Sequence, residues 1–513
     1  MRKIAIAILS QRGCAALVTL LGLLTISHPH ASFADDSVTL EIPDHPGTGT
    51  VEMPIEAQEA PEPPSQELMI ADAIKVQLNK ASLAEGQNAD DVAALTEFYR
   101  TRTGPALWLT TTGFSERGQA LLETIAGADD WGLDPTAFPV PPKEYKPGSE
   151  EDQATTELAI SLAALRYARA ARGGLTEPKS INQIYGHTPT IRPPADVLSE
   201  LSTSTSPDGV LEGLHPKHDQ FARLRKALKS AKSENEDLLL RRNMDRWRWM
   251  PEELGASYVW LNIPEFMVHA VEDGKTVQSE KAIVGATGSP TPVLSADMSE
   301  IVFNPERIVP SAVIRRDVLP KLRGSGSFFG GTGRTAILDQ YGITVKRGGR
   351  TVDPKTIDWK TTNLSGLTFV QKPGRTNIMG KVQFLYPNDQ KVFMRDTTLR
   401  GKFARDIRAD GAKEPRIENA DKLAARILAA TNDANSATVR QQIAGGKTSR
   451  VKLNKPMPVH MTYFTAIVGD DGSVKTFGDV YKLDDLPAAA PSTDGASDAP
   501  REPINGNLAT TSP

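Results

Sequence analysis

The first half of the chain carries the apolar spacing of helices. Apolar residues recur at intervals of three and four, with Gly and Pro at the breaks, which predicts amphipathic helices. The clearest segment is 157–172, and the Gly173-Gly174 pair after it is a typical C-terminal signal of a helix. The other segments are 71–83, 89–102 and 115–128. We therefore expect a helical region over residues 70–235.

The pattern changes at about residue 238 to short runs that are typical of strands. Two such runs, 257–263 and 265–271, precede Asp273-Gly274, a dipeptide that favours the turn of a β-hairpin. A second turn of this kind, Asp471-Gly472, separates two further strand-like runs near the end of the chain. The second half is therefore predicted to be rich in β-structure.

The two patterns together predict an α+β fold class. A helical N-terminal region is followed by a β-rich region over 236–486. A Gly-rich stretch of mixed pattern, at about 310–370, interrupts the β-rich region and is expected to form an insertion.

The first 34 residues have the pattern of a secretory signal. Three basic side chains precede an apolar run over residues 14–26, and Ser32 and Ala34 are the small residues that a signal peptidase requires. The run is too short to cross a bilayer comfortably. We expect cleavage after Ala34 and a mature protein that does not span the membrane, with an uncleaved anchor as the alternative.

The composition narrows the possible chemistry. The 513 residues include 59 basic and 63 acidic side chains, a balance that argues against a polyanion binder, and no nucleic-acid partner is expected. One cysteine, Cys14, excludes a disulfide framework and a structural cysteine–metal site. Because Cys14 lies in the predicted signal, the mature protein would contain no cysteine.

Two segments are not expected to contribute to a folded core. Residues 35–69 carry nine acidic side chains, no Lys or Arg, and several prolines, which is typical of a disordered leader. Residues 487–513 have a similar composition and form the predicted tail. We interpret both as spacers.

Two segments resemble binding motifs only in part. Residues 241–249 mix cations with aromatic side chains, as nucleic-acid binders do, but in a secreted chain they favour a helical linker whose tryptophans pack on the β-rich region. The Gly-rich residues 324–331 have Phe329 where a dinucleotide fingerprint requires glycine. We interpret them as a flexible loop, and no cofactor is expected.

Histidine and serine residues form no recognisable catalytic motif. His215 and His218 could share a metal ion, but Pro216 interrupts the helical face between them, and no metal site is expected. The sequence has no His-Glu-x-x-His or Gly-x-Ser-x-Gly motif, and no serine has a base near it in the sequence. No catalytic centre is evident from these motifs alone.

A longer series of motifs resembles one protein family. Residues 243–251 (NMDRWRWMP) resemble the entry to the catalytic domain of large periplasmic murein L,D-transpeptidases. Further matching segments follow in order at 258–264, 283–285, 291–293, 302–305, 309–310, 319–322, 371–374, 380–388 and 458–460. The helical region resembles the scaffold of that family at 131–135 (WGLDP) and 166–169 (RYAR). The resemblance covers most of residues 70–485.

This resemblance implies a helical scaffold domain over 70–235 and an L,D-transpeptidase-like domain over 236–486, with a lid at about 310–370. It also implies a periplasmic protein that acts on peptidoglycan. In the family a cysteine thiolate attacks a carbonyl of a tetrapeptide stem, backbone donors stabilise the oxyanion, and a histidine transfers protons. Many relatives carry a peptidoglycan-binding module, but in this chain the segment between residues 224 and 243 is too short to contain it.

The catalytic motif of the family, Ser-His-Gly-Cys-x-Arg, is altered in this chain. Gly411 stands for the serine, Ala412 for the histidine, Lys413 for the glycine and Glu414 for the cysteine, while Arg416 is kept. An upstream histidine of the family is replaced by Arg395. A carboxylate is a weak nucleophile toward an amide, and no histidine remains at the site to share protons. We therefore expect no intact catalytic residue.

The basic residues near the altered motif have two interpretations. They could bind the carboxylates of stem peptides, which makes them the candidate substrate-binding residues: Arg395, Arg405, Lys413 and Arg416. They could instead form an ion-pair patch with the neighbouring acids, which are Asp396, Asp410, Glu414 and Glu418.

Three functions remain open at this point. The leading hypothesis is a catalytically inactive L,D-transpeptidase homologue in peptidoglycan biogenesis that binds murein or a cell-wall enzyme. The alternative is an active transpeptidase with a non-standard nucleophile, which requires Glu414 or a serine beside a base. The third is a structural envelope protein whose old pocket is filled and whose helical half is the working surface.

Overall fold

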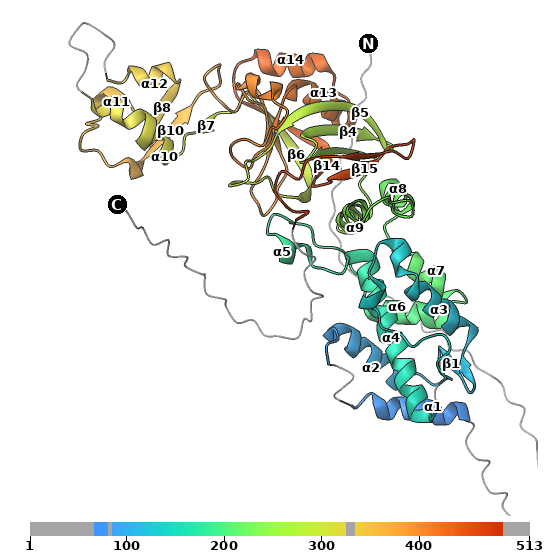
Figure 1. Cartoon of the computed structure of the whole chain (residues 1–513). Helices are drawn as coiled ribbons and strands as arrows, with labels where there is room; N and C mark the ends of the chain where they lie inside the picture. The colour runs from blue at the N-terminus through green and yellow to red at the C-terminus, as the bar shows by residue number, and fades with distance from the viewer. Residues whose placement is uncertain (1–65, 81–84, 147, 325–333, 486–513) are drawn as a thin grey trace, which may run out of the picture. The chain divides into compact units, whose positions relative to one another are not determined.

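The structure is a computed structural model that describes residues 66–80, 85–146, 148–324 and 334–485 (Figure 1). The predicted signal at 1–34, most of the leader at 35–69, nearly all of the Gly-rich loop at 324–331 and the tail at 487–513 lie outside these residues. Within the described residues, no helix combines the length and the apolar composition that crossing a bilayer requires.

The four helices predicted for the first half are present. Their bounds are α1 (Gln66–Gln77), α2 (Ala89–Thr101), α3 (Glu116–Ala126) and α4 (Glu150–Gly173). Helix α4 is the central one, because α1, α2 and α3 all contact it. It begins with a capping box between Ser149 and Asp152, and Gly174, with φ of 80°, follows its end as the sequence predicted. Helix α1 begins at Gln66, so the last residues of the predicted leader are helical.

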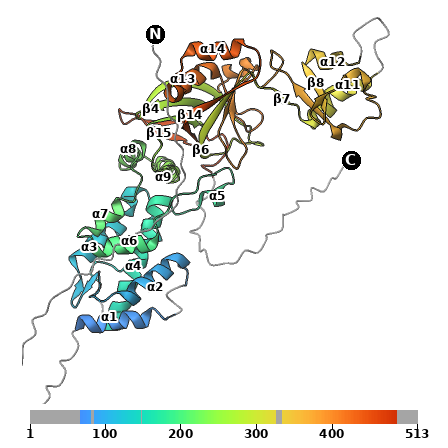
Figure 2. The ribbon, with the colours of Figure 1, turned by 180° about the vertical axis from the view of Figure 1, so that it is seen from behind.

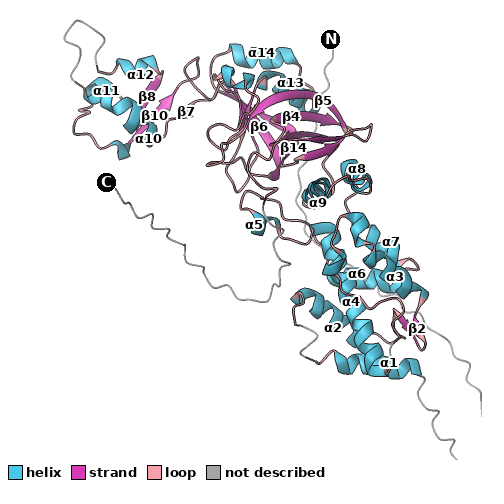
Figure 3. Cartoon of the chain, viewed as in Figure 1, coloured by secondary structure: helices cyan, strands magenta, loops and turns pink. Residues whose placement is uncertain are grey.

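Shorter elements complete the helical region and lead out of it. They are β1 (Leu109–Thr110), β2 (Gly113–Phe114), α5 (Pro178–Ile181), α6 (Pro194–Thr203), α7 (Pro207–Glu212), α8 (Asp219–Leu228) and α9 (Glu234–Arg248). Figure 3 shows that helices dominate this half of the chain. Its core combines aliphatic residues such as Leu95, Leu121 and Leu198 with the fully buried Trp108.

A buried carboxyl group ties the helical region together. Glu157 on α4 is fully buried and accepts hydrogen bonds from the backbone N–H of Leu107 (2.6 Å) and of Trp108 (3.0 Å). The hydroxyl of Tyr99 on α2 donates a third bond to it, at 2.7 Å. Burial raises the pKa of Glu157 above its ordinary value.

The β-rich region is a closed barrel. Eight strands of the described chain follow one another around it in the order β11-β12-β13-β5-β4-β3-β14-β6. The bounds are β3 (Ser257–Asn262), β4 (Met267–Glu272), β5 (Lys275–Ile283), β6 (Leu294–Phe303), β11 (Val382–Leu385), β12 (Met394–Arg395), β13 (Arg416–Ile417) and β14 (Ser449–Thr462). All neighbours are antiparallel except β12 with β13 and β14 with β3, which are parallel.

Two helices cover part of the barrel. Helix α13 (Ala420–Asn432) contacts β14, β11 and β4, and α14 (Ser436–Ala444) packs beside it, as both views show (Figures 1 and 2). The apolar face of α13 includes the fully buried Leu428 and Ala424. The barrel core also takes in Phe303 and Phe384, both completely buried.

The predicted hairpin turns are confirmed. Asp273 and Gly274 adopt φ of 47° and 73° and join β4 to β5, the backbone that a two-residue hairpin turn requires. The second turn joins β15 (Ala466–Val468) to β16 (Val474–Thr476), with Gly472 at φ of 81°.

The insertion after β6 has the predicted mixture of helix and strand. Its helices include α10 (Ser311–Val313), α11 (Leu319–Arg323) and α12 (Ala336–Gln340). Its sheet has the order β7-β10-β8-β9, with bounds β7 (Arg307–Ile308), β8 (Ile343–Arg347), β9 (Arg350–Thr351) and β10 (Leu367–Gln371). A separate apolar cluster that includes Trp359 and Phe369 stabilises it.

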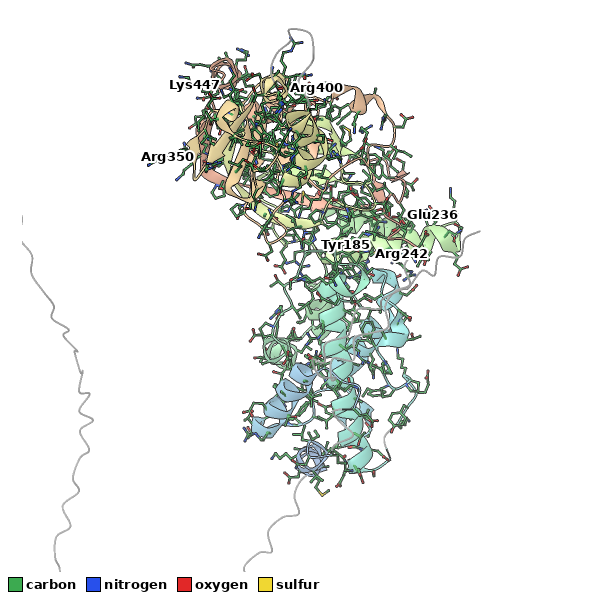
Figure 4. All side chains as sticks on the ribbon, turned by 90° about the vertical axis from the view of Figure 1, so that its left-hand side faces the viewer. Tyr185, Glu236, Arg242, Arg350, Arg400 and Lys447 are labelled. Atoms are coloured by element: carbon green, nitrogen blue, oxygen red, sulfur yellow. The ribbon has the colours of Figure 1, made fainter. Side chains whose placement is uncertain are left out.

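The predicted linker is helix α9, and its tryptophans go to different partners. Trp247 stacks on Phe464 of the β-rich region, with ring centroids 4.6 Å apart. Trp249 instead donates its indole N–H to the carbonyl of Gly173 at 2.9 Å and packs edge to face on Tyr185, which Figure 4 labels. The packing prediction therefore holds for both tryptophans, because Trp249 also belongs to the apolar core of the barrel, and its bond to Gly173 adds a contact with the helical region.

Candidate functional site

The altered motif lies in the loop between two short parallel strands. Strand β12 ends at Arg395, and β13 begins at Arg416, its register partner. On its other side β13 pairs with β5 antiparallel, and a separate parallel bridge joins Val284, just after β5, to Ala409 of the loop. Residues 395 and 416 are thus brought together by the barrel, as the family resemblance implied.

Arg395 is buried among carbonyl groups. Its guanidinium donates to the carbonyl oxygen of Ile378 at 2.6 Å and to that of Asp396 at 2.9 Å. Burial, together with the positive charge of Arg416, lowers the pKa of Arg395 to about 10, so the side chain is still charged at neutral pH. Arg395 therefore places a positive charge where the family pattern has a histidine, and a charged guanidinium cannot accept a proton as a base.

Asp396 is held by three donors. The backbone N–H groups of Lys381 and Thr397 each donate to its carboxylate at 2.7 Å, and the guanidinium of Arg400 does so at 2.6 Å. Burial raises the pKa of Asp396. Arg400, labelled in Figure 4, is half exposed. The ion pair between Arg400 and Asp396 therefore links the buried carboxylate to the protein surface.

Arg416 occupies the space beside Gly411. Its guanidinium donates to the carbonyl of Asp410 at 2.8 Å, and burial lowers its pKa. Gly411 has φ of +95°, and a Cβ atom at this position would lie 2.4 Å from Nη2 of Arg416. The position that holds serine in the family can therefore hold only glycine while Arg416 keeps this conformation.

The three residues after Gly411 do not form a nucleophile–base pair. Ala412 is exposed, and Lys413 donates its ammonium to the carbonyl of Gln390 at 2.5 Å. The backbone carbonyl of Lys413 accepts from the hydroxyl of Thr291 at 2.8 Å. Glu414 is half buried, and within the described part of the chain it has neither a hydrogen bond nor an ion pair. Its negative charge acts on the buried Tyr386, whose pKa burial and Glu414 both raise.

The surface cations pair with Asp410. Arg405 is exposed and lies 3.2 Å from the carboxylate of Asp410, and Lys402 lies 2.8 Å from it. The hydrogen bonds of Lys402 lower the pKa of Asp410. Of the candidate substrate-binding residues, Arg405 thus takes part in an ion pair, whereas Arg395, Lys413 and Arg416 donate to carbonyl groups.

A groove of about 710 Å³ adjoins this loop. Gln390, which accepts from Lys413, lies in its wall together with Asn388 and Asp389. Ser295 and Asp297 of β6 also line it. The groove is large enough for a peptide-sized ligand.

Two serines do have bases beside them, contrary to the sequence prediction. The hydroxyl of Ser279 lies 2.8 Å from Nδ1 of His269, whose Nε2 lies 3.1 Å from the carboxylate of Glu265, and Ser295 lies between two histidines.

The hydroxyl of Ser295 lies 2.8 Å from Nδ1 of His460 and 2.9 Å from Nε2 of His187. His460 also contacts the carbonyl of Leu254 through Nε2, at 3.0 Å, which leaves Nδ1 free to accept a proton. Burial lowers the pKa of His187 to about 3 and also lowers that of His460.

The three residues come from positions far apart in the chain, and this is why the sequence missed them. Ser295 and His460 are register partners on β6 and β14, while His187 belongs to the helical region. Only the pairing of β6 with β14 could have revealed the contact.

His215 and His218 have structural surroundings. His215 stacks on Trp131 with centroids 4.1 Å apart and bonds the hydroxyl of Tyr167 at 3.0 Å. His218 contacts the carbonyl of Pro251 through Nε2. No group of three or more residues able to hold a metal ion occurs among the described residues.

The helical region, the eight-stranded barrel and the mixed insertion define a class of protein in which a helical scaffold precedes a transpeptidase-type domain. Comparison with known families places both parts: residues 93–228 match the Scaffold domain, and residues 256–428 match the L,D-transpeptidase catalytic domain. The chain thus contains, in this order, a region similar to the Scaffold domain and a region similar to the L,D-transpeptidase catalytic domain.

A protein of Haemophilus influenzae, whose name describes it as a candidate L,D-transpeptidase, is 28% identical to this chain over 257 residues. The similarity covers 50% of this chain, and the chain spans about half the length of that relative.

Proposed function

We propose that this protein is a cell-wall member of the L,D-transpeptidase family that has lost acyl transfer and works in peptidoglycan biogenesis by binding murein or a cell-wall enzyme. The observation that carries the proposal is the replacement of the nucleophile. The chain contains no cysteine besides Cys14, and Glu414 stands where the family has its thiol. Acyl transfer through a thioester is then impossible.

The surroundings of Glu414 support the loss of chemistry. No described side chain orients Glu414 by a hydrogen bond or an ion pair, and a carboxylate is a weak nucleophile toward an amide. Attack by the carboxylate on an amide would also give a mixed anhydride, a poor intermediate. The guanidinium groups of Arg395 and Arg416 occupy positions next to the motif and are held by carbonyl oxygens.

The proposed location is the periplasm. The basic start and apolar run of residues 1–34 support export, and the family resemblance supports a site of action on peptidoglycan. The groove beside residues 388–390 offers a place for a murein stem peptide.

A second candidate function is supported by Ser295. Its contact with a neutral, oriented His460 is the nucleophile–base arrangement that the alternative of an active enzyme requires. The same contacts also satisfy three polar groups where the helical region meets the barrel, which accounts for them without chemistry.

The test uses residues 35–513 incubated with tetrapeptide-rich sacculi, followed by digestion, mass spectrometry of the fragments, and pelleting to score binding. We expect specific pelleting and no new cross-link or exchange product. A triple variant, Arg395→His, Ala412→His and Glu414→Cys, is assayed in parallel because it restores the two histidines and the cysteine of the family motif. New cross-links from the unaltered protein would overturn the proposal, and their loss in Ser295→Ala would establish the second candidate.

A further inference from the structure

A hollow of about 380 Å³ lies within the helical region, away from the altered motif in sequence and in domain. It is bounded by the loop after α7, by α8 and by Trp131. Its wall is largely apolar and includes Trp131, Pro216 and Phe221. A hollow of this size accommodates a small ligand.

The rim of this hollow is strongly basic. It carries four cations, which are Lys217, Arg225, Lys226 and Lys229, against one acid, Glu212. Lys229 is paired with Asp130 at 2.9 Å. Lys217 and Lys226 are exposed, and within the described part of the chain they form no ion pair or side-chain hydrogen bond. Two ammonium groups are thus available to an anion.

The wall is held rigidly by stacked groups. The guanidinium of Arg225 lies 3.3 Å from the ring centroid of Trp131, and the ring of His215 stacks on Trp131 at 4.1 Å with an interplanar angle of 3°. Phe221 continues the stack beyond His215, at 6.0 Å. A preformed wall of this kind costs little entropy when a ligand binds.

His215 does not supply charge to the hollow. Burial lowers its pKa well below the ordinary value, so the ring is neutral. Its Nδ1 has no hydrogen-bond partner within the described residues and is covered by neighbouring atoms. Recognition of an anion therefore falls to the exposed lysines.

We propose that this hollow binds the carboxylate end of a short peptide, with Lys217 and Lys226 pairing with the carboxylate and Trp131 and Pro216 contacting a small apolar side chain. The apolar wall favours a peptide over free phosphate, because phosphate has no group to cover that wall. The assignment rests on the proposed function, since a murein stem peptide offers this chemistry, and it places stem-peptide binding in the scaffold.

The test measures binding of a fluorescently labelled tetrapeptide with a C-terminal alanine to residues 35–513 by anisotropy. Lys217→Glu/Lys226→Glu should weaken binding at least about tenfold, because attraction becomes repulsion. The matched control is Lys146→Glu/Lys232→Glu, the same change of charge at two exposed lysines outside the hollow. The control should bind within about twofold of the unaltered protein, and the C-terminal amide of the peptide should bind as weakly as the first variant.

The assignment would be overturned if both double variants lost the same affinity, or if the peptide acid and its amide bound equally well. Displacement of the peptide by inorganic phosphate would overturn it too. Pelleting with sacculi separates this failure from that of the proposed function. If the unaltered protein pellets and Lys217→Glu/Lys226→Glu pellets equally well, the hollow is not the site although murein binding stands. If the unaltered protein does not pellet, murein binding itself fails.

Discussion

Individual side chains show how the altered motif is accommodated. Arg416 is kept from the family pattern, and its guanidinium takes the space beside Gly411, where a side chain would collide with it. Arg395 donates hydrogen bonds to carbonyl oxygens and brings no base to the site. A serine at residue 411 would therefore require the guanidinium of Arg416 to move.

This crowding predicts that Gly411→Ser destabilises the fold. The new Cβ atom would lie 2.4 Å from Arg416 and at a positive φ, which costs about 1–3 kcal/mol. Denaturant unfolding measures the loss. The control is Gly366→Ser, where a Cβ atom meets nothing within 4 Å and stability should be unchanged. Equal stability of the two variants would contradict the crowding at Gly411.

The buried Glu157 predicts a pH-dependent contribution to stability. Burial raises the pKa of this carboxyl group above 4.5, so its contribution is fully present below 4.5 and is lost as the pH rises through the raised folded pKa. Because glutamine does not titrate, the stability deficit of Glu157→Gln should be largest below pH 4.5 and shrink toward neutral pH. Urea unfolding across pH 4–7 measures it, and a deficit that grows with pH would contradict the sign.

Among the elements, the insertion between β7 and β10 has its own sheet and its own apolar cluster. Trp359 anchors this cluster with a side chain only 5% exposed, and its indole N–H donates to the carbonyl of Pro354 at 2.9 Å. Separate cores imply that the insertion can lose structure without loss of the barrel.

Trp359→Ala should therefore act locally. Truncating a buried tryptophan costs about 3–5 kcal/mol, which we expect to remove hydrogen-exchange protection from residues 343–371 while the barrel strands stay protected. Phe384→Ala, in the barrel core, is the comparison and should lower protection throughout the barrel. A uniform loss of protection in Trp359→Ala would show that the two cores unfold together.

Local signals account for the elements that the sequence could predict. The helices of the first half follow apolar spacing and caps, and the Asp-Gly turn at residue 273 marks its hairpin. Helix α4 starts at Glu150, earlier than predicted, because its first turns are polar and carry no apolar period.

Contacts between distant strands could not be predicted in the same way. Strand β14 lies between β3 and β6 although their sequences are far apart, and apolar patterns do not encode such pairing. The neighbours of Arg395 and Arg416 were inferred from the family motif, while the contact of Ser295 with His460 depends on pairing alone.

For the molecule as a whole, we propose that an L,D-transpeptidase-like fold has lost its chemistry and acts by binding. The groove beside residues 388–390 and the basic hollow of the scaffold are lined by different residues, so the two proposed binding places can be tested separately. Their separation predicts that changes at Lys217 and Lys226 leave the barrel's stability unchanged.

The most direct measurement is the intact mass of the protein after incubation with murein tetrapeptides and rapid acid quenching, with a cysteine-containing L,D-transpeptidase as the positive control. Every acyl-transfer mechanism through a side chain of this protein passes through a covalent acyl adduct. We predict no added mass on the unaltered protein. An acyl adduct that disappears in Glu414→Gln or in Ser295→Ala would contradict the loss of chemistry and identify the nucleophile.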